Sequence, residues 1–344
     1  MKEFHENLIS PEEAVTLDGL FARRLHRSPD GLAYQAFDRE SKSWNSYTWK
    51  EVAEQVARWR HALLQEKLHP GDRVAVLLRN CPEWIIWDQA AMSLGLVTVP
   101  LYMDDRPDNV VYILEEAGVK ALLVQDAGRW KRLAPSLPVE GALQRVILLT
   151  AGKEAEKCAA NDDRVRLADQ WLPGSAGQLR VRPDGDSGSL ASIVYTSGTT
   201  GRPKGVMLSH HNMLSVAHGG VTLLDVYEED VFLSFLPLSH TLERTAGYYL
   251  PIMSGSSVAF ARSVAQLGED LLHIRPTLMI AVPRIFERVY GKIKDQLKRK
   301  PAIARNLFNM AVSVGWSRFQ YQQGRGKWSV KHLLWPLLNK LVAS

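Results

Sequence analysis

The chain has 344 residues, enough for one large domain or two, and its 46% hydrophobic and 23% charged residues are typical of a globular protein. The two cysteines, Cys81 and Cys158, are too few for a disulfide framework, which excludes the small disulfide-rich secreted class and favours a reducing cytoplasm. The first residues lack the apolar core of a signal peptide. Residues 245–261, the longest uncharged candidate, are broken by Gly, Pro and Ser, so we expect no membrane span.

The net charge of +5 is unevenly distributed. Residues 284–344 contain thirteen Lys and Arg against Glu287 and Asp295, a balance of +11, so the preceding residues carry −6. Aromatic side chains are interleaved with these cations at Phe308, Trp316, Phe319, Tyr321, Trp328 and Trp335. One interpretation is peripheral association of residues 284–340 with an anionic membrane, or with an acidic partner domain. The other is a solvated basic face over an apolar core stripe, and we expect no nucleic-acid partner.

The first half of the chain alternates strand and helix patterns. Residues 17–25 have helical apolar spacing, and Thr48 with Glu51 fits a capping box that opens a second helix. Short apolar runs follow, with helical patterns between them. The runs are residues 33–37, 46–49, 74–78, 97–101, 120–124 and 146–149, and the later helical patterns are residues 80–95 and 108–117. This alternation predicts an α/β protein with mainly parallel sheets flanked by helices.

Composition suggests a boundary at residues 173–189, which are rich in Gly, Pro, Ser and Asp. We interpret this stretch as a linker between a first α/β subdomain, residues 1–172, and a second, residues 190–344. The second subdomain is predicted to contain strands at 231–236, 257–260 and 278–282, with helices at 211–217 and after Pro283.

The segment YTSGTTGRPKG, residues 195–205, has the chemistry of a phosphate-binding loop. Its glycines allow a tight turn, its hydroxyls donate hydrogen bonds, and its lysine supplies a positive charge. The candidate phosphate ligands are Thr196, Ser197, Gly198, Thr199, Thr200, Gly201 and Lys204. A polar hairpin turn is the simpler alternative. The spacing from Gly198 to Lys204 is wrong for a Walker loop, and the apolar flanks predict strand–loop–strand instead.

Two further segments carry candidate site residues. FLPLSHTLER, residues 235–244, places His240 at the end of an apolar strand, where open α/β sheets usually bind ligands, although a lone His is more often structural. VPRIFE, residues 282–287, places Arg284 at a strand-to-helix junction, where a surface cation is the alternative. His210 and His211 have no Cys, Asp or Glu cluster beside them, so we predict no metal ligated by the chain.

Residues 195–210 resemble the phosphate-loop signature of the AMP-binding, adenylate-forming enzymes, which include acyl-CoA synthetases, firefly luciferases and peptide-synthetase adenylation domains. Residues 236–244 resemble the synthetase motif that flanks the acyl and adenylate pockets. Residues 282–287 are similar to a Pro-Arg-x-Phe/Leu-Glu segment of the long-chain enzymes. The chain as a whole most resembles the N-terminal portion of a long-chain fatty acyl-CoA synthetase.

The resemblance implies a fold, an activity and roles for residues. The fold would be the large N-terminal domain of an adenylate-forming enzyme, and the activity a fatty acid–CoA ligase that uses ATP, Mg2+ and coenzyme A. Lys204 and His240 would be catalytic, with Thr196 to Thr200 on the phosphates. His240, Glu243 and Arg284 would line the substrate pocket. Some bacterial long-chain enzymes have a gating tryptophan four residues after this His; Arg244 stands there, which leaves the acyl gate open to question.

Several family motifs are not found in the 344 residues. These are the Tyr-Gly-x-Thr-Glu string, the Thr-Gly-Asp segment and the small C-terminal domain with its adenylation lysine. We therefore expect a partial AMP-binding domain, residues 1–344, without the small C-terminal domain and unable to complete adenylation alone. Two alternatives stay open: an adenylating enzyme for another carboxylic acid, and a non-catalytic nucleotide-binding or membrane-associated module. We expect the protein to be cytoplasmic and, in one interpretation, peripherally associated with the membrane.

Overall fold

The computed structural model describes residues 7–343 apart from 139, 180–184 and 197–200. The chain divides into two units, Met1–Ile280 and Ala281–Ser344. The first unit contains two sheets and their helices, and the second contains only helical segments in its described part.

The larger sheet has seven strands. They are β3 (Arg73–Leu77), β4 (Val97–Pro100), β5 (Val119–Val124), β6 (Arg145–Leu148), β7 (Val165–Leu167), β8 (Leu190–Thr196) and β9 (Lys204–Ser209). Their spatial order is β7-β6-β5-β3-β4-β8-β9, and every neighbouring pair is parallel except the hairpin β8–β9. The predicted α/β class with a mainly parallel sheet is confirmed.

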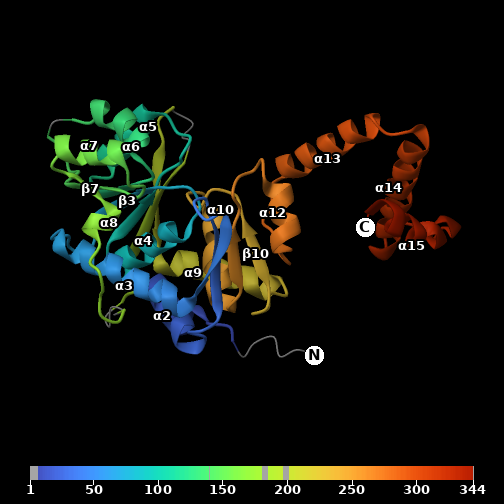
Figure 1. The fold of residues 1–344 in the computed structure, drawn as a ribbon. Coiled ribbons are helices and arrows are strands. Elements are labelled where there is room, and N and C mark those ends of the chain that lie inside the picture. The colour runs from blue at the N-terminus through green and yellow to red at the C-terminus, as the bar shows by residue number, and fades with distance from the viewer. Residues whose placement is uncertain (1–6, 139, 180–184, 197–200, 344) are drawn as a thin grey trace. The chain divides into compact units, whose positions relative to one another are not determined.

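Helices cover both faces of this sheet (Figure 1). On β3, Val74 and Val76 pack into a core with α3 (Trp49–Gln65) and α4 (Pro82–Met92). Ala75 and Leu77 pack into a second core with α5 (Pro107–Glu116), α6 (Ala127–Leu133) and α7 (Lys153–Asn161). Successive side chains of a strand point to opposite faces, so a continuous apolar run was needed to fill both cores.

The smaller sheet has four strands, β1 (Leu32–Asp38), β2 (Ser43–Thr48), β10 (Val231–Ser234) and β11 (Ser257–Phe260), in the order β10-β11-β1-β2. Only β1 and β2 are antiparallel. The remaining helical segments of the first unit are α1 (Pro11–Ala14), α2 (Leu17–Arg27), a 3-10 turn (Ala134–Ser136), α8 (Ala168–Trp171), α9 (His210–Leu223), α10 (Thr241–Arg244), a π-helical turn (Thr245–Tyr249), α11 (Leu250–Ser254) and α12 (Leu267–Ile274). The capping box of Thr48 and Glu51 is confirmed at the start of α3.

The strands do not sort into sheets as the predicted division of the chain implied. β1 and β2, from the predicted first subdomain, pair with β11, whereas the hairpin β8–β9, from the predicted second subdomain, extends the seven-stranded sheet. The stretch at 173–189 therefore connects α8 to β8, which belongs to the same seven-stranded sheet as β3 to β7. Local patterns locate strands, but pairing partners are chosen by long-range packing, which composition does not reveal.

The strand predicted at 278–282 is wrong. Only Leu278 forms a bridge, with Phe232 of β10, and the backbone N–H groups of Thr277 and Leu278 both donate to the Val231 carbonyl. Pro283 starts the next helix soon afterwards. The segment is too short between these constraints to form a ladder of strand hydrogen bonds.

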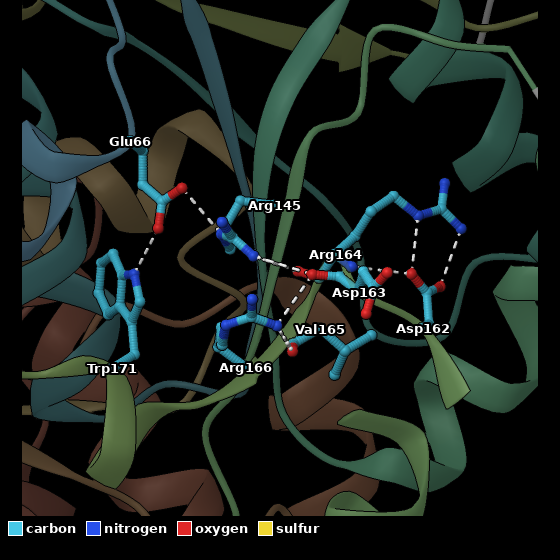
Figure 2. Close-up of polar contacts among 8 residues, drawn as sticks. All are labelled: Glu66, Arg145, Asp162, Asp163, Arg164, Val165, Arg166 and Trp171. Carbon is cyan, nitrogen blue, oxygen red and sulfur yellow. Dashed lines mark hydrogen bonds and ion pairs between the residues drawn. The ribbon is translucent and has the colours of Figure 1, made fainter. Parts of the chain in front are cut away.

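Hydrogen bonds and ion pairs connect a group of mostly charged side chains at the amino ends of β6 and β7 (Figure 2). Arg145 donates from Nε to Glu66 Oε2 at 2.8 Å, and Trp171 donates from Nε1 to Glu66 Oε1 at 2.7 Å. Arg164 makes two hydrogen bonds with Asp162, at 3.0 and 2.9 Å. These cations already have partners and lie at the amino edge of the sheet, opposite the edge where β8 leads into β9. We therefore assign the group a structural role.

The second unit has α13 (Pro283–Lys298), α14 (Ala302–Gln322), a 3-10 turn (Val330–Leu334), α15 (Trp335–Leu338) and a π-helical turn (Asn339–Ala343). Its buried core is small, consisting of Ala311, Val314 and Leu338 among the described residues. Gly315 lets the ring of Trp335 approach, since a Cβ there would lie 2.6 Å from Cζ3. Many of its large apolar side chains are exposed; 62% of the surface of Trp316, for example, is accessible to solvent. Within the described ranges, every helix is too short or too polar to cross a bilayer.

Candidate functional site

The predicted strand–loop–strand is confirmed as the hairpin β8–β9. The innermost described pair of the ladder is Thr196 with Lys204, and the ladder extends back to Leu190 with Ser209. Since β8 runs parallel to β4, the end of the hairpin marked by Thr196 and Lys204 lies at the carboxyl edge of the sheet, where open α/β sheets bind ligands. Of the predicted phosphate ligands, Ser197, Gly198, Thr199 and Thr200 lie outside the described residues.

Two glycines shape the second stem of the hairpin. Gly201 has φ of +92°, a conformation that favours glycine. Gly205 lies against the facing strand, where a Cβ would come within 2.8 Å of Ile193 Cγ2 and 3.1 Å of Tyr195 Cζ. Lys204 between them is exposed, and it makes no ion pair among the described residues. A phosphate group could therefore reach its ammonium without breaking a salt bridge within the described part of the chain.

Helix α5 contacts both stems of the loop. The Tyr195 hydroxyl donates to Glu116 Oε2 just before the loop, and the Arg202 guanidinium lies over the Tyr112 ring at 5.1 Å just after it. Tyr112 and Glu116 are four residues apart, so they share one face of α5. This face fixes the two ends of the loop relative to the sheet.

His240 belongs to the turn that follows β10, and Asn80 holds this turn to the larger sheet. Asn80 follows the carboxyl end of β3. Its Nδ2 donates to Ser234 Oγ at 2.9 Å and to the Leu236 carbonyl at 2.6 Å, while its Oδ1 accepts from Leu238 N at 3.0 Å. One amide side chain thus joins the carboxyl edges of the two sheets, which brings the His240 turn to the edge where Thr196 and Lys204 end the described hairpin.

The imidazole of His240 caps α10. Its Nδ1 accepts a hydrogen bond from Leu242 N at 3.1 Å, and the side chain is exposed. Because Nδ1 is the acceptor, the proton of the neutral ring is on Nε2. The exposed Nε2–H can donate to an oxygen of a carboxylate or phosphate. Because β10 ends at Ser234, His240 lies in the turn beyond the strand and not at its end, and the orienting cap became visible only in the structure.

Glu243 is buried, with 1% of its surface exposed. Among the described residues neither carboxyl oxygen has a hydrogen-bond partner of ordinary geometry. Burial raises the pKa of Glu243 to about 7, and the Ser234 hydroxyl opposes this rise in part. The carboxyl lies against Gly247, where a Cβ would be only 2.5 Å from Oε1. The predicted polar pocket residue is therefore an interior acid beneath the His240 turn.

Arg244, which stands at the position of the gating tryptophan, is fully buried rather than at a pocket mouth. Its guanidinium donates to Asp88 Oδ1 at 2.5 Å, to Ser192 Oγ at 2.6 Å and to the Tyr249 hydroxyl at 3.0 Å. The Tyr249 hydroxyl in turn donates to Asp88 Oδ2 at 2.9 Å. The Trp84 ring faces the guanidinium at 5.2 Å. Arg244 is thus held in the protein interior and is not placed to gate an acyl chain.

Arg284 is exposed in the first turn of α13 and belongs to the second unit. Its participation beside His240 and Glu243 stays a prediction.

The sequence also missed site residues whose importance comes from distant contacts. They are Asn80, Asp88, Tyr112, Glu116 and Ser192. Asn80 alone offered a signal, since it lies in the short connection between a buried strand and a proline-started helix. The described residues bring no three His, Cys, Asp or Glu side chains together in a group that could hold a metal.

Comparison with known proteins agrees with this geometry. Residues 21–318 match the model of the AMP-binding enzyme family. Arabidopsis thaliana long chain acyl-CoA synthetase 1 is 30% identical over 310 residues, which cover 86% of this chain and 46% of that protein. Long chain acyl-CoA synthetase 6, peroxisomal, of the same plant is 32% identical over 310 residues, covering 88% of this chain and 44% of that protein. The chain spans about half the length of the curated relatives it matches.

Solved structures show the same fold. The adenylation domain of a Mycobacterium chelonae carboxylate reductase superposes with a TM-score of 0.71 at 22% identity, covering 88% of this chain and 52% of that one. The architecture is therefore that of the N-terminal domain of adenylate-forming enzymes, as the sequence predicted.

Proposed function

Because this chain belongs to the family of AMP-binding enzymes, we propose that it supplies the phosphate-binding and acid-binding parts of an ATP-dependent long-chain fatty acid–CoA ligase. The observation that carries the proposal is the shared edge of the two sheets. The exposed Lys204 and the hairpin lie at the carboxyl edge of the larger sheet, and Asn80 ties the turn of His240 to that same edge. A carboxylate and a polyphosphate must meet in such a place to react.

The reaction has two steps. The fatty carboxylate attacks the α-phosphorus of ATP, which forms acyl-AMP and releases pyrophosphate, and the thiol of coenzyme A then displaces AMP to give the thioester. Negative charge develops on phosphate oxygens in the first step, so fixed donors and cations should contribute most to the catalysis. Lys204 and the hydroxyls from Thr196 to Thr200 would hold the β- and γ-phosphates and orient the leaving pyrophosphate. Magnesium, carried on the phosphates, would neutralise part of their charge.

His240 would orient the acid. The Nε2–H that its cap leaves exposed can donate to one carboxylate oxygen, or to the oxygen of the acyl-adenylate that replaces it. Glu243 would lie beneath this contact. With a pKa near 7, its carboxyl is largely protonated in slightly acidic solution and adds little negative charge there to repel the substrate.

Pyrophosphate titration tests the phosphate part directly. We expect the chain to bind inorganic pyrophosphate in isothermal titration, and Lys204→Met to weaken binding at least tenfold, because a charge-assisted contact contributes about 1.5–3 kcal/mol. Lys50→Met, at an exposed lysine of α3, is the matched control and should leave the affinity unchanged. The phosphate assignment is wrong if the wild-type chain does not bind, or if both variants bind as it does.

Titration with acids of different size tests the substrate class. Binding is followed by tryptophan fluorescence. Each buried CH2 contributes about 0.8 kcal/mol, so palmitate should bind at least 100-fold more tightly than octanoate, and benzoate should bind more weakly than octanoate. Trp316→Ser, which changes the exposed surface of the second unit, controls for non-specific adsorption. Preference for benzoate or an amino acid would favour an adenylating enzyme for another acid. The chain could instead bind acids while no longer form of the protein catalyses acid-dependent ATP–pyrophosphate exchange. That result would favour a non-catalytic module.

A second candidate role is peripheral membrane association of residues 284–340. The supporting observation is that this region combines a balance of +11 with exposed aromatics, including the stacked pair Trp316 and Phe319 at 5.7 Å. Such a surface can insert aromatic rings between lipid headgroups while its cations face anionic lipid. A cytoplasmic location belongs to the same proposal.

Vesicle flotation tests the membrane role. Wild-type protein should float with vesicles containing about a third phosphatidylserine and not with pure phosphatidylcholine, and added salt should weaken the association. Replacing Lys298, Arg299 and Lys300 by Glu should abolish flotation. Unchanged flotation after this charge reversal would dismiss the electrostatic explanation.

A further inference from the structure

The buried guanidinium of Arg244 connects the two halves of the proposed site. Arg244 lies four residues after His240, and it closes the one-turn helix α10 by donating its backbone N–H to the His240 carbonyl at 3.0 Å. Its side chain reaches Ser192 on β8, four residues before Thr196 at the start of the phosphate loop. At about 3.3 Å per residue, the loop begins about 13 Å along the strand from this contact.

The contact with Ser192 continues into the larger sheet. The Ser192 hydroxyl donates to the Thr98 carbonyl of β4 at 2.7 Å, so the position of Arg244 is tied to the alignment of β8 on its neighbour. Asp88 of α4 holds the other side of the guanidinium, both directly and through the Tyr249 hydroxyl. Asp88, Ser192, Arg244 and Tyr249 are thus joined by four side-chain hydrogen bonds, and all four residues are fully buried.

A buried ion pair is weak evidence of a role in stability, because apolar residues of similar volume often stabilise a core equally well. What a guanidinium adds is direction: its planar fork fixes several acceptors at once. Together with Asn80, which grips residues 234–238, Arg244 anchors the turn on both sides of His240.

We propose that Arg244, with Asp88 and Ser192, is a positioning residue that sets the His240 turn in register with the strand leading into the phosphate loop. The proposal rests on the function proposed above. It assigns Arg244, Asp88 and Ser192 the role of aligning the His240 turn with the strand that leads into the proposed phosphate loop. Arg244 does not touch substrate; it acts through His240 on one side and through β8 on the other.

The experiment compares Arg244→Lys with Arg24→Lys. Arg24 is an equally buried arginine, and it donates to the carbonyls of Asn7, Ile252 and Met253, away from β8 and from the His240 turn. Lysine keeps the charge in both variants but loses the fork. Ser192→Ala is the milder variant, since it removes one hydroxyl of the network and leaves the ion pair with Asp88 in place.

Two properties of the folded 344-residue chain are measured. Titration calorimetry gives the affinity for inorganic pyrophosphate, and nitrogen-resolved NMR of the histidine rings gives the tautomer of His240. We expect Arg244→Lys and Ser192→Ala each to weaken pyrophosphate binding at least fivefold and to turn the fixed Nε2–H tautomer of His240 into an averaged one. Arg24→Lys should change neither property, although it should lower the unfolding temperature.

The outcomes separate the inference from the function on which it rests. A wild-type chain that does not bind pyrophosphate removes the proposed function and the inference with it. A wild-type chain that binds, with Ser192→Ala and Arg244→Lys keeping the affinity within twofold and the tautomer unchanged, overturns the inference alone. A change in the pyrophosphate affinity without a change in the His240 tautomer, or the reverse, also overturns the inference, because a residue that positions both β8 and the His240 turn should affect both.

Discussion

Glu243→Gln tests the buried acid beneath the His240 turn. The carboxyl is almost completely buried, and its pKa is raised from 4.5 to about 7. At about 1.4 kcal/mol for each tenfold change in a protonation equilibrium, the ionised form costs the folded state about 3 kcal/mol. Glutamine keeps the shape of the side chain and cannot ionise, so it should remove most of this cost.

The sign of the effect depends on pH. Below about pH 4.5 the carboxyl is protonated in the folded and unfolded chains alike, and burial of the charge costs nothing. Between about pH 4.5 and 7 the folded chain binds more protons than the unfolded chain, so the free energy of unfolding falls as pH rises. Above about pH 7 the loss is complete. About 2.5 kcal/mol of the difference between wild type and Glu243→Gln should therefore appear between pH 5 and pH 8.

Urea unfolding at several pH values between 5 and 8 measures this difference. Glu54→Gln, at an exposed position of α3, is the matched control and should follow the wild-type curve. Equal stabilisation by Glu243→Gln at pH 5 and pH 8 would refute the assignment of a raised pKa, because the effect would then come from packing rather than from ionisation.

Three further predictions concern the hairpin and the turn. Gly205→Ala would place a methyl group 2.8 Å from Ile193 Cγ2 and should lower the free energy of unfolding by about 1–3 kcal/mol in urea titrations. Gly219→Ala, in a helix with nothing within 4 Å of the new Cβ, should raise it by about 0.5–1 kcal/mol, and equal effects of the two changes would contradict the steric explanation. Asn80→Ala removes three hydrogen bonds and should cost about 1–3 kcal/mol, with faster amide exchange in residues 234–240; slow exchange there would show that Asn80 does not hold the turn. His240→Ala should weaken binding of palmitate at least fivefold and leave pyrophosphate affinity within twofold, and a loss of both affinities would point to a folding defect instead.

Short-range features of the fold were predictable because their causes lie within a few residues. The continuous apolar run at Val74–Leu77 predicted a strand buried on both faces, and the two faces indeed fill two separate cores. Thr48 and Glu51 predicted a helix start through a capping box that spans only four positions. The wrong strand at 278–282 shows the limit of this reasoning, because a short apolar run forms a strand only where a neighbour offers its ladder.

Local sequence patterns were enough to predict the hairpin around residues 197–203 and a turn with His240 beyond a strand. Both follow from local patterns: apolar flanks about a glycine-rich turn, and a polar residue where an apolar run ends. Three features became visible only in the folded chain. β8 joins the larger sheet, Asn80 brings the His240 turn to the same edge, and Arg244 points inward to Asp88 and Ser192. These contacts join residues 52 to 158 positions apart, and partners so distant are selected by the packing of the whole unit.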